Sequence, residues 1–151
     1  MFIQILVDNP NSWILNYAID LKIKLQYIGH KTILTHKHSQ VKSGDILCIL
    51  SCERVFKKLN LNKYNLVVHE SKLPLGKGWS PLTWQVLEGE NDIPITLFEA
   101  ENKIDSGIIY FEDKIILNGN ELIDEIRFKQ GNKTVDLILR FVKNIKKIKP
   151  S

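Results

Sequence analysis

The sequence predicts an α/β fold: a single three-layer domain in which helices flank a mostly parallel sheet. Short segments that are almost wholly apolar recur along the chain, such as Phe2–Val7 and Asp45–Leu50, and a segment with helical periodicity separates them. Apolar strands that alternate with helices are typical of parallel sheets covered on both faces. The 151 residues are an ordinary size for one domain, so we expect one domain over residues 1–151.

The first half of the chain contains signals for three strands and one long helix. Ser12 is suited to the N-cap of that helix, and Gly29 is suited to end it. The expected elements are the strand Phe2–Val7, a turn at Asp8–Ser12, a helix from Ile14 to Ile28, the strands Lys31–His36 and Asp45–Leu50, and a short helix or turn at Glu53–Leu61.

The second half contains signals for three strands and three helices. The expected elements are the strand Asn65–His69, a loop at Glu70–Trp79, a helix at Pro81–Leu87 closed by Gly89, the strands Ile95–Phe98 and Gly107–Phe111, and helices at Leu122–Phe128 and Val135–Ile145. Parallel sheets bind ligands outside the carboxyl ends of their strands. Two loops lie there by this interpretation, Ser51–Arg54 and His69–Gly78.

The net charge of +4 and the isoelectric point near 9.0 come partly from lysines near the C-terminus. A basic cluster can contact nucleic acid or a membrane, but it also suits the C-terminal end of a helix dipole. No nucleic-acid-binding motif accompanies the cluster, so we favour a solvated helix end and expect no nucleic-acid partner. The cluster consists of Lys143, Lys146, Lys147 and Lys149.

The chain shows no signal for membrane insertion or secretion. No apolar run reaches the roughly 18 residues that a membrane span needs, and the N-terminus lacks the pattern of a signal peptide. The two cysteines, Cys48 and Cys52, are too few for a disulfide framework. We therefore expect a cytoplasmic protein with no membrane partner.

Two residues are candidates for chemistry because of where they stand. His69 lies at the carboxyl end of an apolar strand, where an imidazole is within reach of a ligand. The alternative is a structural histidine that caps the strand. Asp105 precedes Ser106, Gly107 and the next strand. The alternative for Asp105 is an ordinary turn aspartate.

The other candidates are weaker. Glycines in the loop after His69 allow close backbone approach to a ligand, and Trp79 and Trp84 offer flat surfaces that could equally serve packing. His36 and His38 lack the partner ligands of a metal site, so no metal is expected. Cys48 is expected to be a small buried residue, and Cys52 could be a nucleophile, although no activating base is evident.

These pieces occur in a fixed order: His69-Glu70-Ser71-Lys72-Leu73-Pro74, then Gly78-Trp79-Ser80-Pro81, then Asp105-Ser106-Gly107. In that order they resemble the folate-dependent formyltransferase family, in which a strand ending in histidine leads into a Ser-x-Leu-Pro loop, a glycine and a helix, followed by an Asp-x-Gly segment. The matched block runs from about Asp45 to Tyr110. The resemblance implies a formyltransferase-like fold and a one-carbon group transfer.

Three further segments narrow the resemblance. They are Asp8–Trp13 (DNPNSW), Leu50–Cys52 (LSC) and Gly76–Gln85 (GKGWSPLTWQ), and they resemble bacterial sugar-nucleotide N-formyltransferases of the pseudaminic-acid pathway type. This implies N10-formyltetrahydrofolate as the donor and the amine of a UDP-linked 4-amino-4,6-dideoxy sugar as the acceptor.

The resemblance also implies roles for individual residues. His69 would stabilise the negative charge on the formyl oxygen or shuttle a proton, and Asp105 would orient His69 and help manage the amine proton. The folate would contact Ser51, Cys52, Arg54, Ser71, Leu73 and Gly78, and the sugar nucleotide would contact Asn9, Trp13, Lys77, Trp79 and Trp84.

The sequence departs from the family in two places. The family has an asparagine two residues before the histidine, where this chain has Val67, and Asn65 is roughly 13 Å away from His69 along a strand. Either Ser51, the donor, the substrate or a backbone amide fills that role, or activity is low or absent. The N-terminal part is also short, because family members have another strand–helix unit before the third strand.

Other interpretations are possible inside and outside the family. A methionyl-tRNA formyltransferase would carry a further C-terminal domain beyond Ser151, and a glycinamide ribonucleotide formyltransferase would have a glycine-rich loop where this chain has DNPNS; we expect neither. Another small amine is a remaining acceptor. A non-catalytic binding protein is the alternative from another class, favoured by Val67 and opposed by the presence of both His69 and Asp105.

The last predicted helix has an apolar stripe at Val135, Ile138, Phe141, Val142 and Ile145. An exposed stripe could pair two copies in a homodimer, but the same residues would also suit the core of one chain. The sequence leaves both open.

Overall fold

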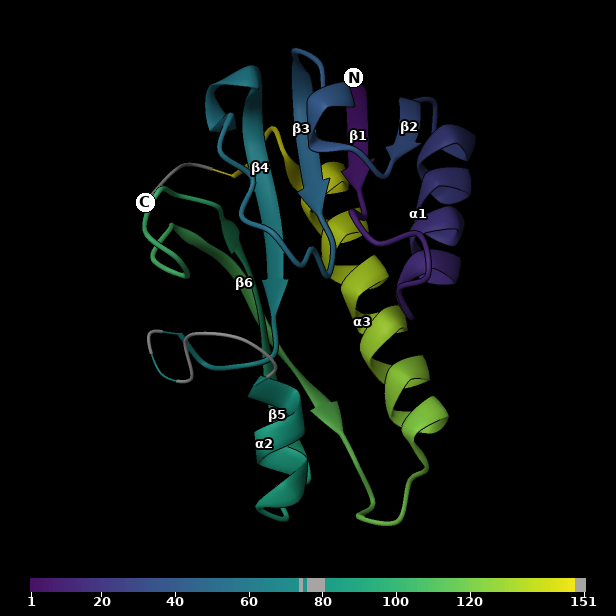
Figure 1. Ribbon diagram of the computed structural model, residues 1–151, viewed down its shortest axis with the longest axis vertical. Helices are drawn as coiled ribbons and strands as arrows, with labels where there is room; N and C mark the ends of the chain where they lie inside the picture. The colour runs from purple at the N-terminus through teal and green to yellow at the C-terminus, as the bar shows by residue number, and fades with distance from the viewer. Residues whose placement is uncertain (74, 76–80, 149–151) are drawn as a thin grey trace. The chain divides into compact units, whose positions relative to one another are not determined.

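The computed structural model describes residues 1–73, 75 and 81–148 (Figure 1). Six strands follow the order β2-β1-β3-β4-β5-β6 in the sheet. Most of the strand pairs are parallel, so the predicted α/β class with a mostly parallel sheet flanked by helices is confirmed. The chain divides into two compact units, Met1–Val67 and Val68–Ser151.

The first unit contains parallel strands and one long helix. Strand β1 pairs with β2 and β3, and β3 pairs with β4, all in parallel register. Helix α1 packs along β2, as Figure 1 shows. The bounds are β1 Phe2–Leu6, α1 Leu15–Tyr27, β2 Lys31–Thr35, β3 Gly44–Ile49 and β4 Asn62–His69, with 3₁₀ turns at His38–Gln40 and Leu59–Leu61. The core is aliphatic, because Ile3, Ile5, Leu47 and Leu66 are fully buried.

Two predictions in this unit need correction. Ser12 is not the N-cap of α1: Ile14 stands in that position, and the Ser12 Oγ accepts only a long 3.4 Å hydrogen bond from the Ile14 N–H. Strand β4 begins at Asn62, earlier than predicted, because the polar Asn62 is buried and its Oδ1 accepts a 2.9 Å hydrogen bond from Gln4. Gly29 does follow the helix, in the left-handed conformation (φ +95°).

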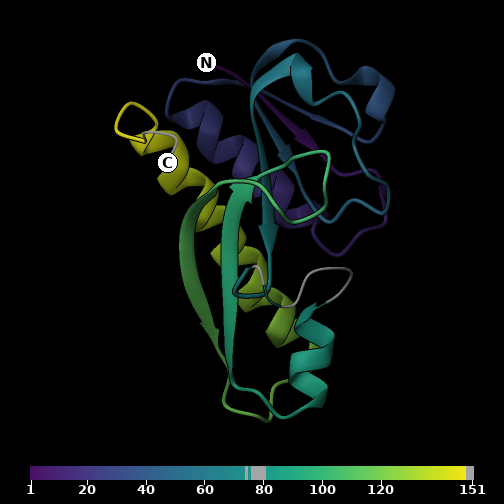
Figure 2. The same cartoon turned by 90° about the vertical axis from the view of Figure 1, so that its left-hand side faces the viewer.

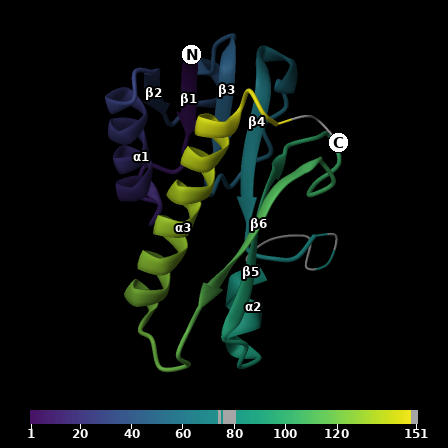
Figure 3. The ribbon, with the colours of Figure 1, turned by 180° about the vertical axis from the view of Figure 1, so that it is seen from behind.

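The second unit is built from an antiparallel hairpin and two helices. Strand β5 pairs with β6 along their length, as Figure 2 shows from the side. Helix α3 contacts β6 (Figure 3). The ring of Phe141 packs 4.7 Å from that of Tyr110. The bounds are α2 Pro81–Leu87, β5 Asp92–Glu99, β6 Ile109–Ile116 and α3 Ile123–Asn144. Among the residues described, no helix is long and apolar enough to cross a membrane.

The prediction of two C-terminal helices was wrong, because α3 runs without a break through Gly131. A glycine inside a helix costs about 1 kcal/mol relative to alanine. The apolar stripe outweighs this cost, since Val135, Ile138, Phe141 and Val142 are all buried and each contributes roughly 1.5–3 kcal/mol. The hairpin strands are also longer than predicted, since β5 continues through Pro94, which lies opposite Lys114.

Candidate functional site

The structure brings His69 and Asp105 together. His69 is the last residue of β4, and Asp105 lies in the turn that joins β5 to β6. The imidazole Nε2 is 3.5 Å from Asp105 Oδ2, and the two side chains are only 10% and 9% exposed. A carboxylate beside an imidazole fixes the orientation of the ring, which suits general acid–base chemistry.

The turn that carries Asp105 is tightly constrained. Asp105 has φ +52°, a left-handed backbone conformation that is uncommon outside glycine. Gly107 is required by space, because a Cβ there would lie 1.7 Å from the carbonyl oxygen of Glu99. The turn is closed by the Glu99 N–H, which donates to the Ile108 carbonyl at 2.9 Å. Strain of this kind persists where the surrounding structure enforces it, and it is enriched at functional sites.

A β-bulge lies directly beside this turn. Leu97 pairs with Phe111, whereas Phe98 pairs with Ile109, so Tyr110 is an extra residue on β6. The Tyr110 hydroxyl donates to the Glu99 carboxylate at 2.9 Å. Bulges increase strand twist and redirect side chains, often next to active sites. This irregularity was not predicted, because nothing in the apolar pattern of β6 marks a shift in strand register.

Side chains from two elements hold the segment after His69. The ladder of β4 ends there, and the next carbonyls need new partners. Gln85 of α2 donates to the Glu70 carbonyl at 2.6 Å, and Thr96 of β5 donates to the Ser71 carbonyl at 2.6 Å. The strand end that presents His69 is therefore fixed by specific hydrogen bonds and not only by packing.

The hydroxyl of Ser71 is buried and has no hydrogen-bond partner within the described part of the chain. A buried polar group without a partner costs roughly 1–3 kcal/mol, so such a group in a loop beside His69 points to a ligand. Leu73 is also buried, whereas Trp84 is 65% exposed on α2 and does not serve the core. Three other predicted residues, Lys77, Gly78 and Trp79, lie outside the described residues.

The first unit gathers the predicted residues that follow β1 and β3. Ser51 has φ +47°, and the exposed Arg54 follows it in the same loop. Asn9 donates to the Glu53 carboxylate at 2.8 Å. Burial raises the pKa of the Cys52 thiol to about 12, and the thiol donates to the Leu6 carbonyl, so Cys52 is not an activated nucleophile. Trp13, also predicted to bind the substrate, packs its ring 6.0 Å from that of Tyr17.

Asp8 organises these loops, a role that was not predicted. Its carboxylate accepts hydrogen bonds from the backbone N–H groups of Glu53 (2.8 Å) and Arg54 (3.1 Å), and it lies 3.0 Å from His38 Nε2. Burial acts to raise the pKa of Asp8, but these hydrogen bonds outweigh burial and lower it below 3.8. The available signal was an aspartate directly after a buried strand.

Asp8, His38 and Cys52 each offer one ligand atom, and these atoms lie within 4.8 Å of one another. A metal would compete there with the hydrogen bonds that the Asp8 carboxylate already accepts and with the thiol proton of Cys52. We therefore assign the cluster to loop structure.

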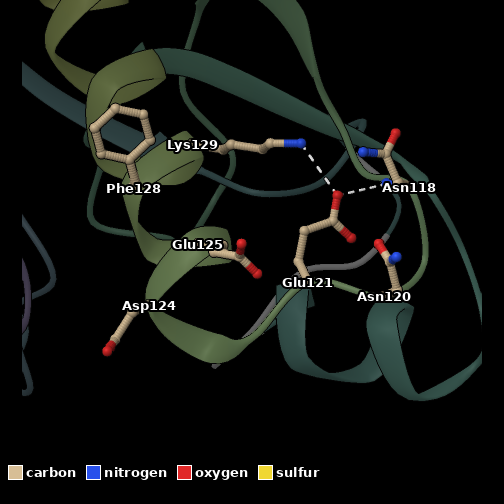
Figure 4. A pocket seen from close by; sticks show the side chains of 7 residues that line it. All are labelled: Asn118, Asn120, Glu121, Asp124, Glu125, Phe128 and Lys129. Atoms are coloured by element: carbon tan, nitrogen blue, oxygen red, sulfur yellow. Dashed lines mark hydrogen bonds and ion pairs between the residues drawn. The ribbon is translucent and has the colours of Figure 1, made fainter.

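A separate surface hollow of about 550 Å³ lies where α3 begins (Figure 4). The main charged group in the hollow, the Glu121 carboxylate, is already satisfied. It accepts hydrogen bonds from the backbone N–H groups of Asn118 and Gly119 and from Lys129. Hydrogen bonding from the Asn118 N–H, chiefly, lowers the pKa of Glu121 to about 2. The hollow contains none of the predicted site residues, and the Glu121 carboxylate in it holds the loop that precedes α3.

Comparison with known proteins identifies the architecture. No family model matches the chain. The structure of methionyl-tRNA formyltransferase from Clostridium thermocellum superposes with a TM-score of 0.82 at 20% identity, covering 100% of this chain and 67% of that one. The chain has the formyltransferase fold. This formyltransferase-like chain is also 26% identical over 91 residues to the methionyl-tRNA formyltransferase of Chlorobium chlorochromatii, which matches 60% of the chain.

The chain spans 28% of the length of that curated relative. A sugar-modifying enzyme is also similar: the formyltransferase PseJ from Anoxybacillus kamchatkensis, solved in complex with UDP-4,6-dideoxy-4-formamido-L-AltNAc and tetrahydrofolate, superposes with a TM-score of 0.64 at 15% identity, covering 97% of this chain and 77% of that one. The comparisons thus support the formyltransferase fold and do not single out the sugar-nucleotide branch.

Proposed function

We propose that residues 1–151 act as a single formyltransferase-like domain that transfers a formyl group from N10-formyltetrahydrofolate to an amine. The observation that carries the proposal is the His69–Asp105 pair, with 3.5 Å between Nε2 and Oδ2 at the end of a parallel strand. Each residue alone has a structural alternative, but the fold brings them together across 36 positions of sequence (105 minus 69), in a turn that is held under backbone strain.

In this mechanism His69 manages protons and charge where the amine meets the formyl carbon. Asp105 keeps the imidazole oriented, with 3.5 Å between Nε2 and Oδ2. A protonated His69 stabilises negative charge on the formyl oxygen, and a neutral His69 accepts the amine proton. Val67 stands where the formyltransferase family has an asparagine, so Ser51, the donor, the acceptor or a backbone amide is proposed to assist His69 there.

The residues present fit a folate donor. When bound, the donor supplies the formyl carbon that the amine attacks. The buried Ser71 hydroxyl, which lacks a partner among the described residues, offers one polar contact beside His69. Leu73 offers an apolar wall, and Gly78 is proposed with them from the sequence. Ser51, Cys52 and Arg54 are the proposed backbone contacts from the other loop.

We propose the amine of a UDP-linked 4-amino-4,6-dideoxy sugar as the acceptor. The solved complex of PseJ shows that a protein of this fold binds such a sugar nucleotide together with tetrahydrofolate. The proposed contacts on this chain are Asn9, Trp13, Lys77, Trp79 and Trp84. The exposed Trp84 supports the assignment, because a large aromatic ring on the surface is available to stack on a ligand.

A panel assay tests the proposal. The chain is incubated with N10-formyltetrahydrofolate and UDP-4-amino sugars, and release of tetrahydrofolate and formylation of the sugar are measured. Turnover that is lost in His69→Ala and Asp105→Ala, with circular dichroism unchanged, supports the proposal. Donor binding without turnover on any acceptor would indicate a catalytically impaired binding protein instead.

Methionyl-tRNA is the second candidate acceptor. The observation that favours it is the similarity to methionyl-tRNA formyltransferases in both sequence and structure. The panel therefore includes methionyl-tRNA, and other small amines such as glycinamide ribonucleotide. Formylation of tRNA at a higher kcat/KM than any sugar would replace the sugar assignment and leave the donor and the His69 mechanism in place.

A further inference from the structure

Glu70 directly follows His69, and its carboxylate is held from α3 by two side chains in series. Gln130 Nε2 donates to Glu70 Oε1 at 2.5 Å, and Arg127 Nη1 donates to Gln130 Oε1 at 2.9 Å. The Gln130 amide is almost fully buried, and it points its donor at the anion and its acceptor at the cation. The three residues therefore form one oriented network, Glu70–Gln130–Arg127.

His69 and Glu70 diverge at the strand end. His69 reaches the turn between β5 and β6, where it meets Asp105, whereas Glu70 reaches α3. Neighbouring residues of an extended chain point to opposite sides, so this arrangement follows from the backbone. The Glu70 backbone is fixed as well, because its carbonyl accepts from Gln85. Glu70 is thus anchored through its carboxylate to α3 and through its carbonyl to α2.

The network holds the charges of Glu70 and Arg127 at places where burial opposes the charged forms. Burial raises the pKa of Glu70, and the hydrogen bond from Gln130 and the positive charges of protonated His69 and of Arg127 act against that rise. Burial likewise lowers the pKa of Arg127, and the charge of Glu70 opposes this. The groups supplied by α2 and β5 at this segment, Gln85 and Thr96, are neutral. An apolar pair would be cheaper to bury, so stability alone does not explain the network.

We propose that Glu70 is a positioning residue for the transfer reaction: held by Gln130 and Arg127, its carboxylate fixes the strand end that carries His69. The inference rests on the proposed function and deepens it, because it assigns a second carboxylate and two residues of α3 to the same site. The Gln130 amide bridges the Arg127 guanidinium and the Glu70 carboxylate, so the position of each group depends on that of the other. Formyl transfer then depends on the ionised form of Glu70.

The test compares Glu70→Gln with the wild-type chain. This variant keeps the shape and an oxygen that accepts from Gln130, but it removes the charge. We expect kcat to fall about tenfold to a hundredfold, the usual effect of losing a partner that supports a working histidine, with little change in KM. Thermal stability at neutral pH should stay the same or rise, because a buried charge is gone. A merely structural Glu70 gives the reverse pattern, with lower stability and an unchanged kcat.

The pH dependence of stability supplies an independent readout. Because burial raises the pKa of Glu70, the contribution of this group to stability is full at low pH and is lost as the pH rises through the raised pKa. As the pH falls, the melting temperature of the wild-type chain should therefore rise relative to that of Glu70→Gln. If the difference in melting temperature between the two chains stayed constant across pH, Glu70 would not be a buried carboxylate that ionises in the folded chain.

Two controls separate the network from general damage. Gln130→Met removes the bridging amide, and we expect both kcat and stability to fall. Glu121→Gln alters another carboxylate that accepts backbone N–H groups before α3, but no contact joins it to His69 among those found; it should lower stability and leave kcat unchanged. An active wild-type chain with unchanged kcat in Glu70→Gln overturns this inference alone, whereas an inactive wild-type chain overturns the proposed function and this role together.

Discussion

Each compact unit of the chain holds one aspartate–histidine pair, and the two pairs are built differently. In the first unit Asp8 lies 3.0 Å from His38 and also accepts two backbone N–H groups. In the second unit Asp105 lies 3.5 Å from His69, on a backbone in the left-handed conformation. The Asp8 carboxylate is thus tied to the backbone of a neighbouring loop, whereas Asp105 is carried by a turn with a left-handed backbone. We assign the first pair to loop structure and propose the second as the reacting pair.

Exchanging the histidines for alanine should separate the two pairs most strongly. We expect His69→Ala to lose about 10²–10⁴-fold in turnover, the typical contribution of general acid–base catalysis. His38→Ala should keep most of its turnover and lose about 1 kcal/mol of stability, since one hydrogen bond is removed. Tetrahydrofolate release and urea unfolding measure the two effects. Equal turnover in the two variants would remove the distinction.

Replacing the aspartates by asparagine should sharpen the same contrast. Asp105→Asn removes the charge but tolerates the left-handed backbone, so we expect turnover to fall about 10²-fold while the melting temperature hardly changes. Asp8→Asn places an amide NH₂ near backbone donors, so its main effect should be on stability. Thermal melts and initial rates on both variants test this. A large loss of stability in Asp105→Asn would mean that Asp105 is a structural turn residue.

A substitution at Gly107, in the turn after Asp105, tests sterically whether the shape of this turn matters for stability and turnover. In Gly107→Ala the added Cβ would lie 1.7 Å from a backbone oxygen, so the turn must shift. We expect a loss of about 2–3 kcal/mol, as for other forced backbone changes, together with reduced turnover. Gly29→Ala is the matched control, because its Cβ meets nothing within 4 Å and only its positive φ is strained; that strain costs about 1 kcal/mol. Equal losses in the two variants, measured by urea unfolding, would contradict the steric argument.

Acid should weaken the Asp8 pair in a predictable direction. The pKa of Asp8 is lowered in the folded chain, so its contribution to stability is full above the unfolded pKa of about 3.9 and is lost as the pH falls through the lowered value. The gap in melting temperature between the wild-type chain and Asp8→Asn should therefore narrow below about pH 4. A gap that widens in acid would show that the carboxylate is not held by hydrogen bonds.

The sequence was sufficient to predict features that depend on local pattern. The strands of the first unit and helix α1 follow from apolar runs and from Gly29, whereas the pairing of His69 with Asp105 was implied only by the resemblance to formyltransferases. Features set by tertiary packing were missed. Gly131 looks like a break until its neighbours are buried, and Asn62 looks like a loop residue until Gln4 satisfies its side chain. Asp8 and Glu70 were missed because their partners are distant in sequence, and only the fold brings Glu53 or Gln130 to them.

Ser51 and Asp105 are the two non-glycine residues with positive φ in the described part of the chain. A design procedure that ranks residues by their backbone conformational energy would place glycine at both positions and would report a more stable protein. It would also delete the proposed reacting carboxylate of Asp105 and the side chain of Ser51, one of the groups considered for the role of the family asparagine. The positive φ angles of these two residues therefore mark positions that should be kept unchanged when this scaffold is engineered for higher thermal stability.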